Sequence, residues 1–387
     1  MTKEVIWTDQ LMIPIAHFSH AVKVENVIHV GATAGTDAER RLAGATPGLV
    51  DVSAQIYKMF ENLETVLGLL GAGLGDVVRL KTYLADPRST PLYREIYAKC
   101  LGTVRLSHTV VASWGFPLPQ AAVELDALAI IGAAAAIRDH DCSQRGRRCG
   151  KEHYCTALPF GADGGIAACD VAAQTQQAFQ NLAATLSEAG LSLQEIVNLH
   201  VTLSDIRDFA AFETSFQEVF EPPFPSRTVV GAPLQQPEML VQVESITVMG
   251  GGRPVEDPSS PKVLGCASPA MIAGDTIYIG GQIGVEADGK IPSRPEEQTR
   301  AALMCVRRLI ESAEFHVDGL LRTNNVLTDW RSYSGFNAGY GANVSGPYPP
   351  RTTVLGQLLD PRALVQVEGV AHRYGDAAAI VQAAGFR

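Results

Sequence analysis

Hydrophobic and polar residues follow a repeating order of strand-like and helix-like stretches along the chain. Near the N-terminus, AVKVENVIHVGATAG alternates about Glu25 and Asn26, which predicts a hairpin. A helix-like stretch centred on Asn62 follows, and then the strand-like RLKTYLAD. A second helix from Pro91 to Cys100 precedes two strands, SHTVVASW and AAVELDALAII. The pattern predicts a mainly antiparallel sheet with two helices on one face.

The same order occurs three times, and the copies share fixed landmarks. Each first helix carries a glutamine, and the following strand ends in an aspartate at the same interval. These pairs are Gln55 with Asp86, Gln174 with Asp205, and Gln298 with Asp329. A second landmark, seen in SHTVV, SRTVV and PRTTV, recurs about every 120 residues, which is the length of a domain rather than a solenoid turn. We therefore predict three tandem α+β units.

We expect the units to occupy residues 13–137, 138–250 and 258–387, with a linker at 251–257 in the Gly- and Pro-rich MGGGRPVEDPSSPK. The second helix of the third unit is expected to be weak, because four glycines between positions 335 and 346 disfavour helix. Strands such as VVASW and LVQVE are apolar on both faces, so both faces must be buried. Three such sheets can pack together as a pseudo-trimer with a central barrel-like core.

Composition and charge narrow the class of protein. The chain has 387 residues, of which 46% are hydrophobic and 19% charged, as expected for a globular protein with a large core. The net charge of −10 argues against a nucleic-acid partner bound through a broad basic face. No apolar run approaches the ~20 residues needed to cross a membrane. We expect neither a membrane partner nor a secretory signal in MTKEVIWTDQLMIP, and we expect a cytoplasmic location.

The seven cysteines are too scattered to suggest a disulfide framework, which fits a reducing compartment. Four of them gather near His153 at the start of the second copy, namely Cys142, Cys149, Cys155 and Cys169. Their spacing matches no recognised zinc pattern, although Cys149, His153 and Cys155 are possible zinc ligands. We prefer partly buried thiols on strands and expect no metal.

Short motifs in all three copies carry a family resemblance. The third copy contains IGGQIG, EQT, VLTD, PPRTTV and VQVEGVA, the second NLAATLSEAG, VTLSDIRDFAAF and FPSRTVV, and the first FSHAVKVENVIHVGA and VELDALA. Together these resemble the RidA/YjgF family of reactive-intermediate deaminases, also labelled endoribonuclease L-PSP. The resemblance implies chorismate-mutase-like units and trimers with a cleft at each subunit boundary. We therefore expect a monomeric pseudo-trimer, with a higher oligomer as the alternative.

The resemblance assigns carboxylate binding to an arginine before the fifth strand of each unit. Arg227 and Arg351 fill this position, and a guanidinium offers two parallel N–H donors that match a carboxylate. The alternative is that both bridge neighbouring units structurally. His108 stands there in the first copy, and imidazole cannot make the same two-pronged contact. His108 is expected to bind substrate poorly, to act as a general base, or to be structural.

The resemblance also places an acid on the final strand of each unit, which is Asp126, Glu244 or Glu368. We predict that Glu368 and Glu244 are catalytic, because a carboxylate facing the cleft can position water and move a proton. The alternative is a salt bridge at the cleft rim with the arginine of the same site.

Further site residues come from the third copy. The strand end Gly280, Gly281 and Gln282 lets backbone approach a ligand and offers N–H donors. The resemblance makes Asn337, in the second helix, a further cleft residue, and we include it among the catalytic candidates.

Two positions of the family pattern are changed in this chain. The asparagine is kept only in the third copy, and the family tyrosine near the first strand is absent throughout. Their replacements are Arg94 and Glu213 for the asparagine, and Phe18, Cys142 and Ala267 for the tyrosine. By this count the third copy is the most intact and the first the most altered.

The leading hypothesis is a deaminase-type hydrolase acting on a C–N bond. Its substrate would be a small carboxylate-bearing imine or enamine, attacked by water that Glu368 positions, without metal or organic cofactor. One alternative is a diverged lyase, hydrolase or cyclising enzyme of a biosynthetic pathway. Its substrate would be a cyclic, chorismate-like carboxylate, because chorismate-cleaving enzymes have a similar core. Further alternatives are a non-catalytic ligand-binding protein and, least favoured by the acidic charge, a ribonuclease.

Overall fold

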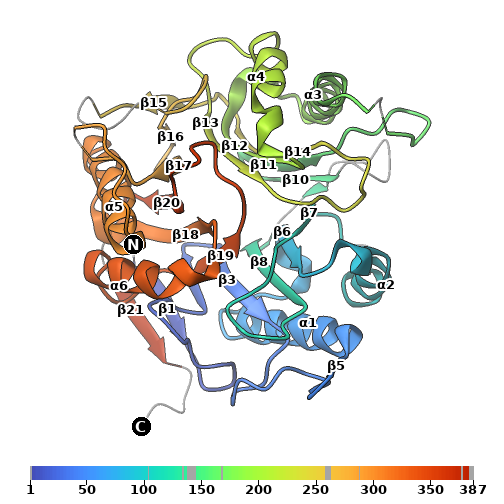
Figure 1. Ribbon diagram of the computed structural model, residues 1–387, viewed down its shortest axis with the longest axis vertical. Helices are drawn as coiled ribbons and strands as arrows, with labels where there is room; N and C mark the ends of the chain where they lie inside the picture. Colours follow the sequence, from blue (N-terminus) through green and yellow to red (C-terminus); the bar gives the residue numbers. More distant parts are fainter. Residues whose placement is uncertain are drawn as a thin grey trace.

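Three open β-sheets surround the centre of the molecule, and the long helices lie outside them (Figure 1). The computed structural model describes residues 2–102, 104–132, 135–136, 145–166, 169–257, 263–286, 288–375 and 378–382. No sheet among these residues is closed, so the predicted barrel-like core is not seen. The sheets instead meet through side chains and isolated bridges such as Val111 with Leu234 and Gly231 with Gln357.

The first sheet has seven strands in the order β21-β1-β2-β3-β8-β6-β7. Its strands from the first copy are β1 (Lys3–Trp7), β2 (Ala21–Val24), β3 (Val27–Ala34), β6 (Val77–Leu84), β7 (Ser107–Ala112) and β8 (Val123–Ile130). The other elements are the pair β4 (Ala45–Thr46) and β5 (Leu49–Val50), and the helices α1 (Val52–Gly68) and α2 (Thr90–Leu101). The Glu25-Asn26 turn joins β2 to β3 as predicted, with Glu25 at φ 54°.

The second sheet has the order β13-β12-β14-β11-β10-β9. Its strands are β9 (Ala135–Ala136), β10 (Arg145–Cys149), β11 (Glu152–Ala157), β12 (Ile196–Leu203), β13 (Ser226–Gly231) and β14 (Val241–Val248). Its helices are α3 (Val171–Glu188) and α4 (Phe209–Gln217). Phe179, Phe212 and Phe216 form part of the apolar core between these helices and the sheet.

The third sheet has the order β15-β16-β17-β20-β18-β19. Its strands are β15 (Arg253–Val255), β16 (Ala270–Ala273), β17 (Thr276–Ile283), β18 (Leu320–Leu327), β19 (Arg351–Leu355) and β20 (Val365–His372). Its helices are α5 (Pro295–Ser312) and α6 (Tyr333–Asn343). In every sheet the two strands that flank the second helix are parallel to each other, namely β6–β7, β12–β13 and β18–β19.

Four strands depart from the units expected from the sequence. β1 precedes residue 13, and β9 joins the second sheet although it lies within residues 13–137. Residues 251–257 were expected to be a linker, yet β15 lies within them and pairs with β16. The last strand, β21 (Ala378–Gln382), pairs in parallel with β1 and so joins the first sheet. The unit boundaries stay a prediction, but the sheets exchange strands at their edges.

The landmark glutamines and aspartates have structural roles. Gln174 Nε2 donates to Glu238 O at 2.9 Å, and its Oε1 accepts from Leu240 N at 2.8 Å. Gln55 and Gln298 make the corresponding pairs of bonds. Asp86, Asp205 and Asp329 each cap a one-turn 3-10 helix by accepting a backbone N–H two residues later. The fixed interval therefore preserves a glutamine bridge to the backbone and an aspartate cap in each copy.

The second helix of the third copy is regular despite its glycines, which corrects the expectation of a weak helix. A Cβ at Gly339 would lie 2.6 Å from Glu296 O and 2.9 Å from Thr299 Cβ, both on α5. Glycine at this position therefore lets α6 approach α5 closely, and this packing outweighs its poor helix propensity.

Candidate functional site

The boundaries between copies bring the arginine position of one copy against the glycine position of the next. A Cβ at Gly280 would lie 2.8 Å from Arg227 N, and one at Gly31 would lie 3.1 Å from Arg351 N. The strand pairs in contact are β7 with β11, β13 with β17, and β19 with β3, so the three boundaries follow one another in a closed order. We name them the 1–2 seam (His108 and Thr156), the 2–3 seam (Arg227 and Gly280) and the 3–1 seam (Arg351 and Gly31).

This order divides the predicted site residues between seams. Gly280, Gly281 and Gln282 belong to the 2–3 seam with Arg227, whereas Arg351 lies in the 3–1 seam. The third copy therefore contributes predicted site residues to two different seams, with Asn337 beside Arg351 in the 3–1 seam. Each site therefore has to be described by the seam that forms it, because no single copy contains all residues of a site.

In the 3–1 seam, Arg351 is a buried cation with neutral neighbours. Its side chain begins β19, the residue is 3% exposed, and its Nη2 donates to the amide oxygen of Asn337. The guanidinium lies 4.8 Å from the ring centre of Tyr340 and 5.6 Å from that of Phe18. Nη1 is buried and has no hydrogen-bond partner among the described residues. Burial lowers the pKa of Arg351, and the groups that oppose this shift are Tyr340 and Tyr333 rather than carboxylates.

The first copy covers this arginine. Phe18, in the position of the family tyrosine, lies over the guanidinium, and the neighbouring His17 packs edge-on against Tyr348 at 5.1 Å between ring centres. His17 Nδ1 is buried without a hydrogen-bond partner among the described residues. Phe18 therefore covers part of the Arg351 guanidinium.

In the 2–3 seam, the guanidinium of Arg227 is paired with a carboxylate of the chain itself. Arg227 Nη2 donates to Glu213 Oε2 at 2.7 Å, and the other Glu213 oxygen accepts from Cys266 N. The Phe216 ring lies 4.4 Å from the guanidinium. Gly265, at φ 77°, permits this approach, because its Cβ would lie 2.6 Å from both Arg227 Nη2 and Glu213 Oε1. Glu213 thus makes the contacts expected of a bound carboxylate.

A cavity of about 210 Å³ adjoins this pair. Arg227, Gly281, Gln282 and Arg362 line it, together with apolar residues of the third copy. Arg362 is paired with Asp360 at 2.7 Å, so both arginines of this cavity have carboxylate partners. The cavity is therefore less cationic than its two guanidiniums alone would indicate.

In the 1–2 seam, His108 is held by aromatic residues. Its Nε2 lies 2.9 Å from Tyr93 Oη, and its ring stacks on Tyr97 at 4.2 Å with an interplanar angle of 8°. Across the same boundary, Thr156 Oγ1 lies 2.8 Å from Ser107 Oγ. These contacts favour the structural reading of His108 over a free general base.

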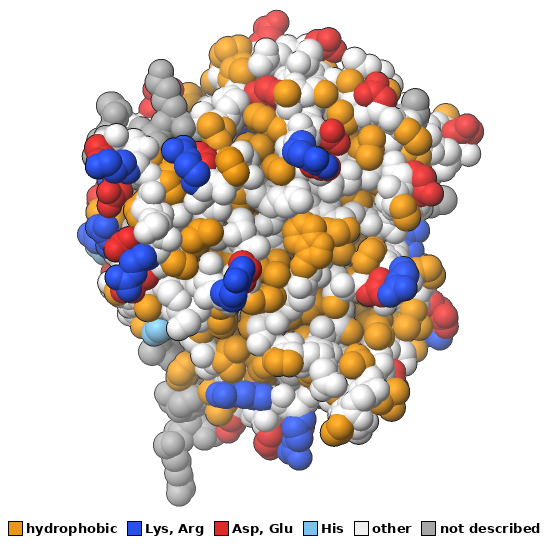
Figure 2. Space-filling model, viewed as in Figure 1, with side chains coloured by type: hydrophobic (Ala, Val, Ile, Leu, Met, Phe, Trp, Pro, Cys, Tyr) orange, Lys and Arg blue, Asp and Glu red, His pale blue; other side chains and the backbone are white. Residues whose placement is uncertain are grey.

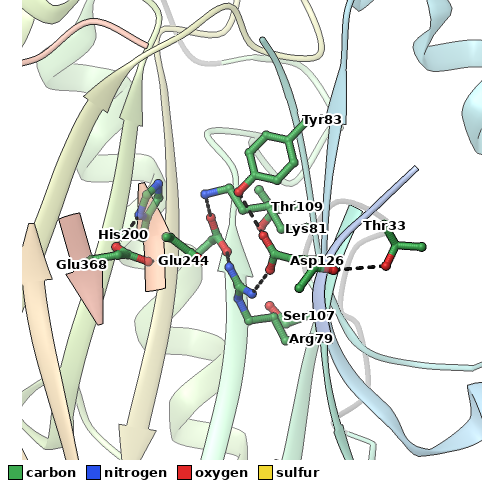
Figure 3. Close-up of polar contacts among 12 residues, drawn as sticks. Thr33, Arg79, Lys81, Tyr83, Ser107, Thr109, Asp126, His200, Glu244 and Glu368 are labelled. Carbon is green, nitrogen blue, oxygen red and sulfur yellow. Dashed lines mark hydrogen bonds and ion pairs between the residues drawn. The ribbon is translucent and has the colours of Figure 1, made fainter. Parts of the chain in front are cut away.

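The acids of the final strands lie where the three sheets meet (Figure 3). Glu244 Oε1 lies 2.6 Å from Lys81 Nζ, and Arg79 bridges Glu244 at 3.1 Å and Asp126 at 2.7 Å. These partners differ from the rim arginines that the salt-bridge alternative required. The ion pairs join the first copy to the second in a buried position.

Glu368 belongs to the same central network. It lies 3.2 Å from His200 Nδ1 and 2.7 Å from Asn324 Nδ2, so it links the third copy to the second. Against the opposing effect of burial, His200 holds the pKa of Glu368 well below its ordinary value, and Lys81 and Arg79 lower that of Glu244 to about 2. Both carboxylates are held by neighbouring side chains of the network, and the catalytic role of Glu368 and Glu244 stays a prediction.

Sequence reasoning missed the basic partners in this network. Arg79 and Lys81 alternate with apolar residues in RLKTYLAD, a strand that is buried along its whole length. Arg322 stands at the position of the third copy that corresponds to Arg79, opposite Val370 rather than Leu128. The signal that could have indicated these partners was the charged residues at alternate positions of a strand whose two faces are buried.

The cysteine cluster expected near His153 is only partly described, because Cys142 lies outside the described residues. Within the described part of the chain, no group of three or more His, Cys, Asp or Glu side chains is placed to hold a metal ion. Among the same residues, none of the helices has the length and apolar character required to cross a membrane.

Comparison with known proteins identifies the repeated unit. A model of the family described as endoribonuclease L-PSP matches residues 8–131, 154–249 and 258–373. A RutC family protein of Pyrococcus abyssi is 31% identical over 131 residues, which are 33% of this chain and 98% of that protein.

Two solved structures are similar to this chain, and the first of them shows a related fold. A chorismatase structure is 12% identical in sequence and superimposes with a TM-score of 0.58. The matched region covers 77% of this chain and 93% of the chorismatase chain. RidA from the Antarctic bacterium Psychrobacter sp. is 25% identical and covers 31% of this chain and 98% of its own, with a TM-score of 0.29. With three matches that together span most of its length, the chain belongs to the RidA/YjgF, or endoribonuclease L-PSP, family and carries three copies of its unit.

Proposed function

We propose that this chain binds a small carboxylate at Arg351 in the 3–1 seam and hydrolyses imines or enamines that carry it. The observation that supports this most strongly is the buried Arg351 guanidinium, which has no carboxylate partner among the described residues. An isolated charge is costly to bury, and a ligand carboxylate would compensate it. In the 2–3 seam, Glu213 already supplies that compensation to Arg227.

The proposed reaction needs few protein groups. Arg351 would hold the carboxylate, and Asn337 would fix the guanidinium through its amide oxygen. Water adds to the electrophilic C=N carbon, and the tetrahedral adduct loses ammonia to leave a 2-oxo acid. Glu368 and Glu244 are not assigned to proton transfer in this scheme, because both are bound in the central network. Entry requires the Phe18 side chain to move off Arg351.

Turnover of a 2-imino acid, generated in place from an amino acid by an oxidase, tests the proposal. Arg351→Lys keeps the charge but loses the two-pronged contact, so we expect kcat/KM to fall by at least about tenfold. The matched variant Arg227→Lys should change it by less than about threefold, because Glu213 already occupies Arg227. Undiminished turnover by a folded Arg351→Lys protein, or equal losses in both variants, would refute the proposal.

A second candidate is an enzyme acting on a cyclic, chorismate-like carboxylate at the 2–3 seam. The fold likeness to a chorismatase and the cavity of about 210 Å³ beside Arg227 and Arg362 support it. Incubation with chorismate, followed by its absorbance, distinguishes the candidates. Consumption that Arg362→Gln abolishes and Arg351→Lys spares would favour this second function.

We also propose that the chain is a single-chain counterpart of a trimer. The closed order of the three seams supports this arrangement. Light scattering on the purified protein should then give the mass of one chain, 41.3 kDa. A stable mass of three chains would contradict it.

A further inference from the structure

A cavity of about 280 Å³ opens where the three sheets meet, and neither Arg227 nor Arg351 lines it. We call it the central pocket. Strands of all three copies form its wall, and one position of the wall recurs in each copy. The residues at that position are His29 opposite Leu128, Tyr154 opposite Ile246, and Tyr278 opposite Val370. The pocket is thus a feature of the assembled chain rather than of one unit.

Two of these three side chains have a partner, and the third does not. Tyr278 Oη donates to Glu152 Oε1 at 2.9 Å, and Tyr154 Oη donates to the other oxygen of Glu152. His29 is 5% exposed, and its buried Nδ1 has no hydrogen-bond partner among the described residues. An unsatisfied buried ring nitrogen beside a cavity indicates a missing partner.

A second recurring position supplies the charge. Arg79, Asn198 and Arg322 lie at corresponding places on β6, β12 and β18, and together with Glu244 and Glu368 they line a smaller cavity of about 10 Å³. Arg79 is bound by Asp126 and Glu244. The Arg322 side chain lines the central pocket and makes no hydrogen bond or ion pair within the described part of the chain, although its charge helps to lower the pKa of Glu368.

The surroundings of His29 agree with a cationic pocket. Burial, and then the positive charges of Arg322, His372 and Arg79, hold the pKa of His29 well below its ordinary value. His29 is therefore neutral near pH 7 and keeps one N–H donor and one acceptor. Lys151 adds a cation to the pocket, and Glu25 and Glu152 add anions, of which Glu152 is already bound by two tyrosine hydroxyls.

We propose that the central pocket binds a small oxyanion, of the phosphate or dicarboxylate type, between Arg322 and His29. The guanidinium would supply parallel donors, and the imidazole would supply one more. A volume of about 280 Å³ holds on the order of nine waters, so either anion fits. This site does not depend on the function proposed for the 3–1 seam.

Calorimetric titration with inorganic phosphate, and in parallel with succinate, tests the site and identifies the type of anion. We expect saturable binding of at least one of them at low ionic strength, and a loss of about tenfold or more in affinity in Arg322→Gln. Arg331→Gln is the matched control, because Arg331 has the same charge but lies exposed and paired with Asp329. It should bind as the unchanged protein does.

His29→Phe provides a second variant if Arg322→Gln fails to fold. It keeps a ring in the wall and removes the N–H donor, so affinity should again fall. Absence of saturable binding by the unchanged protein, or equal losses in Arg322→Gln and Arg331→Gln, would overturn the proposal. With phosphate, which the 3–1 seam is not proposed to bind, Arg351→Lys should keep its affinity, and this separates the result from the outcome of the imine assay.

Discussion

Glu213 Oε2 lies 2.7 Å from Arg227 Nη2, so the chain supplies its own carboxylate to the arginine position of the second copy. In the third copy the corresponding residue is Asn337, which leaves the charge of Arg351 uncompensated among the described residues. The two seams therefore differ at this position, where one copy has the acid Glu213 and the other the amide Asn337.

We predict that Glu213→Asn opens the 2–3 seam to carboxylates. Removing the built-in anion frees Arg227, and the number of 2-oxobutyrate molecules bound per chain should rise from about one to about two. Calorimetry measures this ratio. Glu218→Asn, at the exposed residue that follows the same helix, is the control and should leave the ratio unchanged. A folded Glu213→Asn protein with an unaltered ratio would show that Glu213 does not block the site.

Acid should weaken the fold through Glu244. Lys81 and Arg79 lower its pKa to about 2 in the folded chain from an ordinary 4.5. Its stabilising contribution is therefore present above pH 4.5 and is lost as the pH falls towards 2. Urea unfolding between about pH 7 and pH 3 should show the free energy of unfolding falling across this range.

Glu244→Gln should remove part of that pH dependence and lower stability at neutral pH by about 3–5 kcal/mol, because Lys81 and Arg79 stay buried with fewer partners. Glu314→Gln, which alters an exposed acid, is the comparison. A Glu244→Gln protein as stable as the unchanged chain would contradict the importance of the central ion pairs.

Gly339→Ala should destabilise the protein although alanine favours helix. The added Cβ would lie 2.6 Å from Glu296 O on α5, so the two helices must separate. Gly68→Ala, at the end of α1, meets nothing within 4 Å and should stabilise by about 0.4–1 kcal/mol. Thermal melting of both variants decides the point, and a shift of the same sign would be evidence against close helix contact.

The repeated glutamine should matter more than its neighbour on the same helix. Gln174→Ala leaves Leu240 N and Glu238 O without their partner and should cost about 1–3 kcal/mol. Gln176→Ala, at an exposed position, should cost less than about 0.5 kcal/mol. Chemical denaturation of the pair tests this, and equal effects would mean that the landmark is not structural.

The repeated unit could be predicted well, because the landmarks Gln174 and Asp205 and their counterparts are recognised from residue spacing within one copy. Helix caps and buried side-chain bridges depend on spacing within one unit. The sequence did not predict that β21 would pair with β1, or that β15 would extend the third sheet. Edge pairing depends on which strands become neighbours in space, and alternation alone does not specify a partner.

For the candidate site, the residue types were easier to predict than the residues that surround them in space. Arg227 and Arg351 were found from their strand motif, but the copies that face them follow only from the order of the seams. The roles assigned to Glu244 and Glu368 required that they face a cleft. Their central placement follows from Arg79, Lys81 and His200, which lie on neighbouring strands far away in the sequence.

The face in Figure 2 shows basic side chains lying against acidic ones, with apolar side chains between them. Asp86 with Arg88, Asp205 with Arg207, and Asp329 with Arg331 are equivalent exposed pairs in the three copies. These surface positions have stayed alike, whereas the seams and the centre have diverged.

The central trio of Arg79, Asn198 and Arg322 illustrates what covalent linkage makes available to evolution. In an assembly of identical subunits, one codon sets all three positions, so a guanidinium there would be triplicated and would face two like charges. With a separate codon for each position, one side chain can remain neutral while another forms ion pairs and a third stays available.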